Sequence, residues 1–174
     1  MSKHRWERIL HQNSWLRPRI LLVLVMGGCG PKHPVSAPSP RLERQLILTM
    51  PSDTGMLVTL GPGVPRVLDF WAPTCGPCKT SLPDLVQREK EITAHGAELR
   101  LIAVLAEDET VDGVRATLRS WGVEHDFLIS RESSAARDAG VTSLPATYVL
   151  DRAATLIWSA PTPINVNDVI AALP

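Results

Sequence analysis

The spacing of apolar residues predicts a series of strands and helices between residues 42 and 174. Period-two runs indicate strands, and apolar residues three or four positions apart indicate helices. Strands are expected at residues 45–50, 56–60, 66–71, 99–106, 126–130, 146–150 and 155–159, and helices at residues 79–93, 111–121, 133–139 and 165–173. This order predicts an α/β domain with a mixed sheet, in which an N-terminal hairpin precedes the other elements. Residues 99–106 are apolar on both faces, as expected of a central strand covered on both sides.

The N-terminal segment has the plan of a secretory signal. Residues 1–19 are polar and basic, Ile20–Met26 is a short apolar run, and Gly27-Gly28-Cys29 follows. The run is far shorter than the roughly 20 residues that span a membrane. This ending resembles a bacterial lipobox, which implies cleavage before Cys29 and a lipid on that cysteine. The alternatives are a conventional signal peptide or an uncleaved anchor, and all three place the rest of the chain outside the cytoplasm.

A proline-rich tether is expected after this signal. Four prolines among the 11 residues Gly30–Pro40 exclude helix and sheet and favour an extended segment. Because Gly30 rather than aspartate follows Cys29, the lipoprotein resemblance implies sorting to the outer membrane of a Gram-negative bacterium. The predicted organisation is a signal peptide at residues 1–28, a tether at residues 29–41 and one folded domain at residues 42–174.

The charge distribution argues against nucleic acid as a partner. The chain has 174 residues, of which 18 are basic and 18 acidic. Five of the basic residues and one of the acidic residues lie in residues 1–28, which leaves 13 and 17 for the remainder. The folded part is therefore mildly acidic and offers no basic stripe for a phosphate backbone. Its length suits a single domain with its own core, which we expect to be a monomer.

The segment Trp71–Lys79 carries the chemistry. It reads W-A-P-T-C-G-P-C-K, so Cys75 and Cys78 lie three positions apart between a predicted strand and a predicted helix. A thiol at a helix N-terminus is stabilised as the thiolate by the helix dipole. The second cysteine lies one turn further along and can close a small disulfide ring. The motif therefore predicts a two-electron redox switch.

Two motifs together resemble the thioredoxin family. Residues Val67–Ala72 followed by Cys75-Gly76-Pro77-Cys78-Lys79 look like its active site, and Val141–Asp151 looks like the segment that carries its cis-proline. The extra helix and strand at residues 111–130 resemble the insertion of the TlpA/ResA-like branch of anchored extracytoplasmic thioredoxins. The resemblance covers residues 42–174 and implies a thioredoxin-like fold.

The resemblance also implies roles for individual residues. Cys75 corresponds to the attacking cysteine, Cys78 to the resolving cysteine, and Asp69 to a buried acid beneath them that relays the proton of Cys78. A strand-end aspartate that reaches solvent is the alternative for Asp69. The implied substrate-binding residues around the disulfide are Trp71, Thr74, Gly76, Pro77, Leu144 and Pro145, with a cis bond before Pro145. The chain departs from thioredoxin in having Thr74 before the first cysteine and only Arg100 near the position of a lysine partner for the acid.

The activity implied is thiol–disulfide exchange with protein substrates in the bacterial periplasm. The Gly76-Pro77 dipeptide favours a reductant fed by a membrane electron donor, with apocytochrome c as one substrate of this branch. An oxidase or isomerase, a copper chaperone, a peroxidase and a non-catalytic adaptor are the alternatives. We expect no metal or other cofactor, because His95 and His125 lack metal-site spacing to the cysteines. A c-type haem would need histidine where Lys79 stands.

Overall fold

The computed structural model describes residues 44–131, 134–161 and 163–174. Its elements are β1 (Leu48–Pro51), β2 (Leu57–Leu60), β3 (Arg66–Trp71), α1 (Cys78–Gln87), α2 (Glu89–Ala94), β4 (Glu98–Leu105), α3 (Val111–Ser120), β5 (Phe127–Arg131), α4 (Ser134–Asp138), β6 (Ala146–Leu150), β7 (Leu156–Ala160) and α5 (Val166–Ala171). Their order agrees with the expected one except that the first predicted helix is divided in two.

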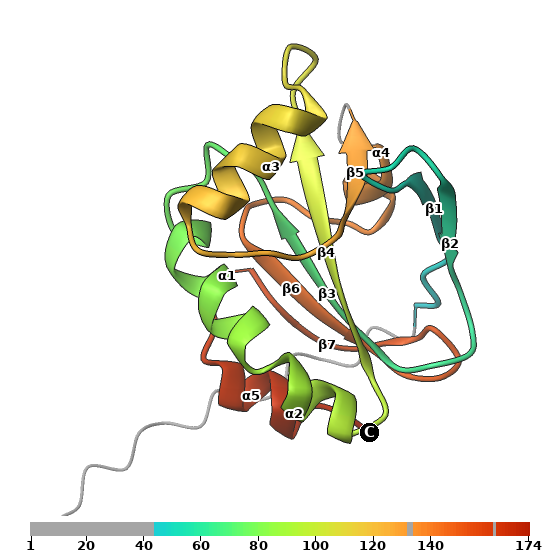
Figure 1. Cartoon of the computed structure of the whole chain (residues 1–174). Coiled ribbons are helices and arrows are strands. Elements are labelled where there is room, and N and C mark those ends of the chain that lie inside the picture. Colours follow the sequence, from blue (N-terminus) through green and yellow to red (C-terminus); the bar gives the residue numbers. More distant parts are fainter. Residues whose placement is uncertain (1–43, 132–133, 162) are drawn as a thin grey trace, which may run out of the picture. The chain divides into compact units, whose positions relative to one another are not determined.

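A five-stranded mixed sheet forms the centre of the domain, with the strand order β5-β4-β3-β6-β7. Strand β3 is parallel to β4, which is parallel to β5. On the other side β3 is antiparallel to β6, which is antiparallel to β7. Strand β3 is therefore the middle strand, and the loop that follows it leaves from the centre of one sheet edge. This arrangement is the predicted thioredoxin-like α/β fold (Figure 1).

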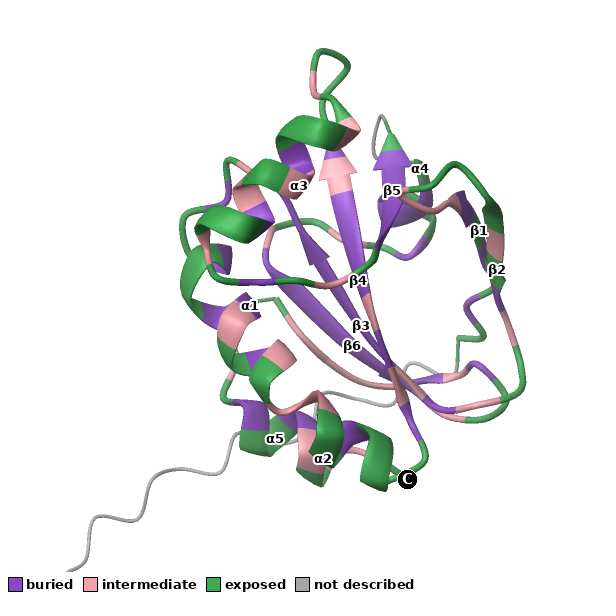
Figure 2. Cartoon of the chain, in the orientation of Figure 1, coloured by how far each residue is buried: buried purple, intermediate pink, exposed green. Residues whose placement is uncertain are grey.

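Two apolar layers cover the sheet, one on each face. Figure 1 shows α1, α2, α3 and α5 over one face. Their apolar side chains pack there against alternate strand residues. On the other face lie α4 and the β1–β2 hairpin. Because successive side chains of a strand point to opposite faces, β3 divides between the layers. Val67 and Trp71 belong to the helical layer, whereas Leu68 and Phe70 belong to the hairpin layer. Figure 2 shows β3, β4, β5 and β6 as predominantly buried between the two layers, whereas the edge strand β7 is mostly half-buried.

The single helix predicted at residues 79–93 is wrong, because two helices meet at Arg88. The backbone of Arg88 has φ −101° and ψ 14°, and its N–H donates to the carbonyl of Leu85 at 3.2 Å. The side chain of Arg88 reaches Glu91 at 2.7 Å and Asn167 at 2.6 Å. Since Asn167 lies in α5, Arg88 both ends α1 and connects it to the C-terminal helix. The apolar spacing continues across the break because Leu85 and Ile92 both face the same core.

Local signals in the sequence agree with the observed boundaries of the other elements. The predicted hairpin is present, with Leu48 opposite Leu60 in an antiparallel pair. Helix α4 is followed by Gly140, whose φ of +78° suits glycine at a helix C-terminus. Helices α3 and α5 are capped by the side chains of Thr110 and Asn165, which accept hydrogen bonds from backbone N–H groups of the first turn.

Candidate active site

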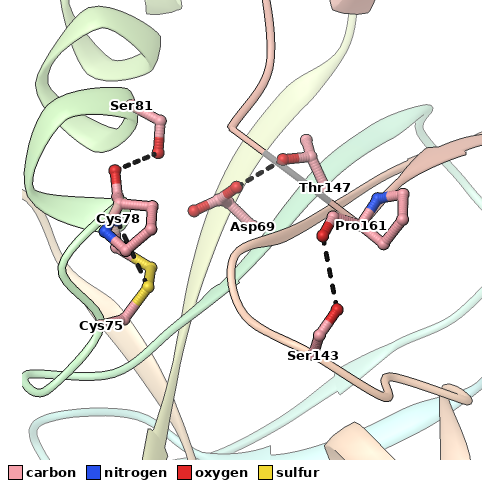
Figure 3. Close-up of a disulfide and its surroundings, with 8 residues drawn as sticks. Asp69, Cys75, Cys78, Ser81, Ser143, Thr147 and Pro161 are labelled. Atoms are coloured by element: carbon pink, nitrogen blue, oxygen red, sulfur yellow. Dashed lines mark hydrogen bonds between the residues drawn. A yellow bond between two sulfur atoms is a disulfide. The ribbon is translucent and has the colours of Figure 1, made fainter.

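The two cysteines of the motif form a disulfide at the predicted strand-to-helix junction. Strand β3 ends at Trp71 and α1 begins at Cys78, with Cys75 in the connecting loop. A disulfide joins Cys75 and Cys78, whose Cα atoms are 5.3 Å apart (Figure 3). Because β3 is the middle strand, the helical layer and the sheet together support this loop from beneath.

The two sulfur atoms have different surroundings. Cys75 retains 9% of its surface in contact with solvent, whereas Cys78 retains none. The backbone N–H of Cys78, the first residue of α1, donates to the sulfur of Cys75 at 3.3 Å. After reduction, this N–H group and the positive end of the helix dipole would stabilise a thiolate on Cys75. The geometry therefore suits Cys75 as the attacking thiol and Cys78 as the resolving thiol.

Asp69 is buried in the helical layer beneath this loop. It is 2% exposed and lies between Val67 and Trp71 on the same face of β3, so it is not the solvent-reaching aspartate of the alternative interpretation. Its Oδ1 accepts a hydrogen bond of 2.6 Å from the hydroxyl of Thr147, the residue opposite it in the β3–β6 ladder. Its Oδ2 has no hydrogen-bond partner among the described residues. In Figure 3 the free oxygen points toward the side on which Cys78 and the disulfide lie.

Burial makes Asp69 a weak acid. Loss of hydration raises the pKa of its carboxyl from 3.8 to about 7, although the hydrogen bond from Thr147 opposes this shift. No cation contributes, since the β4 residue opposite Asp69 is Leu101. Arg100, the one basic candidate on that strand, pairs with Glu98 at 3.0 Å. A carboxyl with a pKa near neutral pH can both accept and return a proton under physiological conditions.

The segment before β6 forms the other wall of the site. The bond between Leu144 and Pro145, expected to be cis, is cis in the structure. Pro145 is buried and Leu144 is half-buried. Ala146 pairs with Phe70 in the ladder between β6 and β3. This register places Pro145 beside the end of β3, from which the cysteine loop leaves.

One predicted substrate-binding residue needs a correction. Trp71 is completely buried, and its ring packs edge-to-face on Trp121 and Phe127 with centroid separations of 5.5 and 6.4 Å. The alternation of β3 directs the indole into the helical layer, so Trp71 supports the loop from within and does not line its surface. Thr74, Gly76 and Pro77, from the same predicted set, are all exposed around the disulfide.

A hollow next to Thr74, the residue before Cys75, was not anticipated from the sequence. It has a volume of about 490 Å³ and is lined by Thr74 and by residues 104–109, which comprise the last two residues of β4 and the loop after it. The signal for it is topological: parallel neighbours β3 and β4 end at the same sheet edge, so the loops after them lie together. Thr147 was missed as well, because the antiparallel register that places it opposite Asp69 cannot be deduced from either segment alone.

The predicted N-terminal features lie outside the residues that the structure describes. Cys29, the signal peptide at residues 1–28 and the tether at residues 29–41 belong to the part that is not described. Across residues 44–131, 134–161 and 163–174, no helix has the length and apolar character needed to cross a membrane. Within the same ranges, no group of three or more His, Cys, Asp or Glu side chains could hold a metal ion.

Fold and site together define a thioredoxin-fold protein with a redox-active cysteine pair. The chain belongs to the AhpC/TSA family, whose model matches residues 52–159. It is 31% identical over 87 residues to the thioredoxin-like protein YneN of Bacillus subtilis, covering 49% of each chain. It is 26% identical over 91 residues to the thiol-disulfide oxidoreductase ResA of the same organism, covering 52% of this chain and 48% of ResA. The chain thus spans about half the length of the curated relatives it matches.

Solved structures agree with this assignment of the fold. A Chlorobium tepidum protein described as thiol:disulfide interchange protein DsbE has a TM-score of 0.63 and 24% identity, covering 78% of this chain and 99% of that one. StoA from Bacillus subtilis has a TM-score of 0.57 and 15% identity, covering 76% of this chain and 99% of that one. Together the matches confirm the predicted resemblance to the TlpA/ResA-like branch of thioredoxin-fold proteins.

Proposed function

We propose that the protein is an extracytoplasmic thiol–disulfide oxidoreductase that reduces disulfide bonds in protein substrates. The observation that carries this proposal is the disulfide at the start of α1, in which partly exposed Cys75 accepts a hydrogen bond from the N–H of buried Cys78. An attacking thiol needs access and a stabilised thiolate, and a resolving thiol needs only to reach the first. The similarity to ResA, which is a thiol-disulfide oxidoreductase, supports the same chemistry.

The proposed cycle begins with the reduced protein. The thiolate of Cys75 attacks one sulfur of the substrate disulfide, forms a new S–S bond and releases the other sulfur as a thiolate. The Cys78 thiol then gives its proton to Asp69, and its sulfur attacks the sulfur of Cys75. The Cys75–Cys78 disulfide forms, the mixed disulfide breaks and the second substrate sulfur leaves. Two electrons have passed from the protein to the substrate, and a membrane electron donor restores the dithiol.

The surface around the disulfide is proposed to bind an extended substrate segment. Thr74, Gly76 and Pro77 are exposed on one side of the cysteines. Leu144 lies in the opposite wall, where its backbone can pair with the substrate beside Pro145. The hollow next to Thr74 extends this surface and gives the substrate room beyond its reacting sulfur. Trp71 takes no direct part in this surface, since it is fully buried.

The direction of electron flow is decided by the reduction potential. Because Gly76-Pro77 resembles the dipeptide of thioredoxin, we expect a value near about −270 mV, compared with about −120 mV for strongly oxidising relatives. Equilibration with glutathione and dithiothreitol buffers, followed by thiol alkylation and mass spectrometry, measures this potential. A value above about −150 mV would contradict a reductant and favour an oxidase or isomerase. A reducing value would be compatible with apocytochrome c as one substrate.

The location is proposed to be the periplasmic side of a bacterial membrane. A signal peptide at residues 1–28 would direct the chain out of the cytoplasm and be cleaved before Cys29. A lipid on Cys29 and a tether at residues 29–41 would then hold the domain at residues 42–174 near the membrane surface. Metabolic labelling with palmitate should mark the full-length protein and should fail to mark Cys29→Ala. Equal labelling of both proteins would contradict the lipid, and recovery of the protein in the cytoplasmic fraction would contradict the location.

The other candidate functions make different predictions. A copper chaperone would retain stoichiometric copper after purification and lose it in Cys75→Ser. A peroxidase would consume peroxide, which the proposed reductase does not require. A non-catalytic adaptor would leave substrate disulfides intact although its own cysteines are present. The partial exposure of Cys75 and the hydrogen bond that it accepts at the start of α1 favour exchange chemistry over these alternatives.

A further inference from the structure

Among the described residues, the pair formed by Asp69 and Thr147 is the one side-chain-to-side-chain hydrogen bond that is buried. The described residues include only four buried polar or charged side chains, which are Asp69, Ser81, Ser130 and Thr147. The hydroxyl of Ser81 donates to the backbone carbonyl of Pro77, and the hydroxyl of Ser130 accepts from a backbone N–H. These two serines satisfy the backbone of a helix or turn. Thr147 instead donates to a carboxyl group at 2.6 Å, so its partner can change charge.

The surroundings of Asp69 let the Thr147 hydroxyl contact only one of its two carboxyl oxygens. Thr147 has no exposed surface, and it projects from β6 onto the same face as Asp69, its partner in the ladder. Apolar residues adjoin the pair along and across the strands, among them Val67, Leu101 and Val149. The threonine therefore occupies Oδ1, and no described residue occupies Oδ2. A buried carboxylate oxygen without a partner is costly, and it is retained where the chemistry uses it.

We propose that Thr147 is a positioning residue, which fixes Oδ1 of Asp69 and leaves Oδ2 directed at Cys78 as the acceptor of its thiol proton. This inference rests on the proposed exchange reaction and adds a residue to its resolving step. The hydrogen bond described for the Thr147 hydroxyl goes to Asp69, so Thr147 would act through that carboxyl. Figure 3 shows the three groups in this sequence, with the Asp69 carboxyl between Thr147 and the cysteine loop.

The hydroxyl of Thr147 affects the pKa of Asp69 as well as the orientation of its carboxyl. A hydrogen bond to a carboxylate stabilises the charged form, so Thr147 lowers the pKa of Asp69 from the value that burial alone would set. The result is a pKa of about 7, at which a substantial fraction of the protein holds a carboxylate ready to accept a proton. Without the hydroxyl, the carboxyl would stay protonated at neutral pH and resolution would slow.

The cysteines are the only titratable groups described at this position. From β4, Leu101 is opposite Asp69, and Arg100 belongs to the other side of the strand. From β6, Tyr148 packs on Phe70 in the hairpin layer. The charged residues of the helices that cover this face are half-buried or exposed, namely Lys79, Asp84, Glu89, Lys90, Glu91, Asp112, Arg115, Arg119 and Asp168. A pH effect of Thr147 is therefore expected to act through Asp69.

Two measurements on Thr147→Val and Thr147→Ser test this inference. Carbon-13 NMR follows the titration of the Asp69 carboxyl in the oxidised protein, where the cysteines do not titrate. Acid-quench mass spectrometry then follows the reduced protein with hydroxyethyl disulfide, separating formation of the Cys75 mixed disulfide from its resolution by Cys78. Valine removes the hydroxyl and keeps the shape of threonine, whereas serine keeps the hydroxyl. If the valine variant does not fold, Thr147→Ala replaces it in both measurements.

We expect the Asp69 titration midpoint to rise by about one pH unit in Thr147→Val, since a hydrogen bond to a charged group is lost. At pH 7 the resolution rate should fall about fivefold, because the carboxylate fraction falls from about one half to about one tenth. Mixed-disulfide formation should not change. Thr147→Ser should retain the wild-type titration midpoint of Asp69 and the wild-type resolution rate. Asp69→Asn should lose the pH dependence of resolution that is attributable to the carboxyl.

Three results would overturn the inference, and they separate it from the proposed function. The positioning role is wrong, while exchange through the cysteines stands, in either of two cases. One is that Thr147→Val keeps the wild-type titration midpoint of Asp69 and the wild-type resolution rate. The other is that Thr147→Ser changes them as far as Thr147→Val does. If Asp69→Asn keeps the pH dependence of the wild type, the proton-acceptor role of Asp69 is wrong together with that of Thr147. If the wild-type protein forms no mixed disulfide on Cys75, the exchange function itself is contradicted.

Discussion

Replacing Cys75 with serine is expected to reduce insulin-disulfide reduction to the background rate of dithiothreitol alone. Serine retains the loop geometry but cannot form the mixed disulfide, because a hydroxyl is not an exchange nucleophile. Cys78→Ser should also lose turnover, but for a different reason: its Cys75 can still attack and then has no resolving partner. The difference in exposure underlies this asymmetry, since Cys75 retains 9% of its surface in contact with solvent and Cys78 retains none.

Lys79→Ala provides a matched control for the cysteine variants. Lys79 is exposed on α1, directly after the motif, and it contributes no thiol. The turnover of Lys79→Ala should stay close to that of the wild-type protein. The circular dichroism spectra of the wild type and the three variants should be similar in shape. Wild-type turnover in Cys75→Ser would show that another group performs the reduction and would contradict the assigned roles.

The second large effect concerns stability, and it is expected from Asp69→Asn. The carboxyl has a pKa of about 7 in the folded protein and an ordinary value of 3.8 when exposed. Between these values the folded state binds more protons than the unfolded state, so stability falls as pH rises from about 4 to about 7 and then levels off. The loss amounts to roughly 4 kcal/mol, since about three pKa units separate the two states.

The asparagine variant removes this penalty because its amide does not ionise. Urea unfolding of the oxidised proteins between pH 4 and pH 8 should therefore show a stability difference that favours Asp69→Asn increasingly toward pH 8. Asp84→Asn, which changes an exposed carboxyl on α1, is the matched control and should follow the wild-type pH dependence closely. Parallel curves for wild type and Asp69→Asn would mean that Asp69 is not the buried acid described above.

Much of the fold could be predicted from local patterns. The strand Arg66–Trp71 was predicted with its observed bounds, and the helix after Thr110 with its first residue, because apolar periodicity and capping residues act locally. The division of the redox helix at Arg88 could not be predicted. It depends on a contact with Asn167, 79 positions away, and the apolar spacing on both sides of the break is compatible with one helix.

In the site, too, the features set by local sequence could be predicted, and those that depend on distant residues could not. The position of the cysteine motif at the start of a helix could be predicted, because the spacing of Cys75 and Cys78 and the apolar pattern around them are local. Burial of Asp69 agreed with the resemblance, but its partner Thr147 depends on the register of two strands 78 positions apart. The misassignment of Trp71 has a similar origin, because its apolar neighbours Trp121 and Phe127 come from later elements.

The most direct test of the proposed exchange is a trapping experiment in cells that express Cys78→Ser. After acid quenching, non-reducing electrophoresis and mass spectrometry should find Cys75 joined to a cysteine of a partner protein, and Cys75→Ser/Cys78→Ser should capture none. Reduction should release the partner and identify it as a substrate or as the electron donor. If Cys75 of the single variant stays a free thiol and no mixed disulfide accumulates, exchange through this cysteine pair is contradicted.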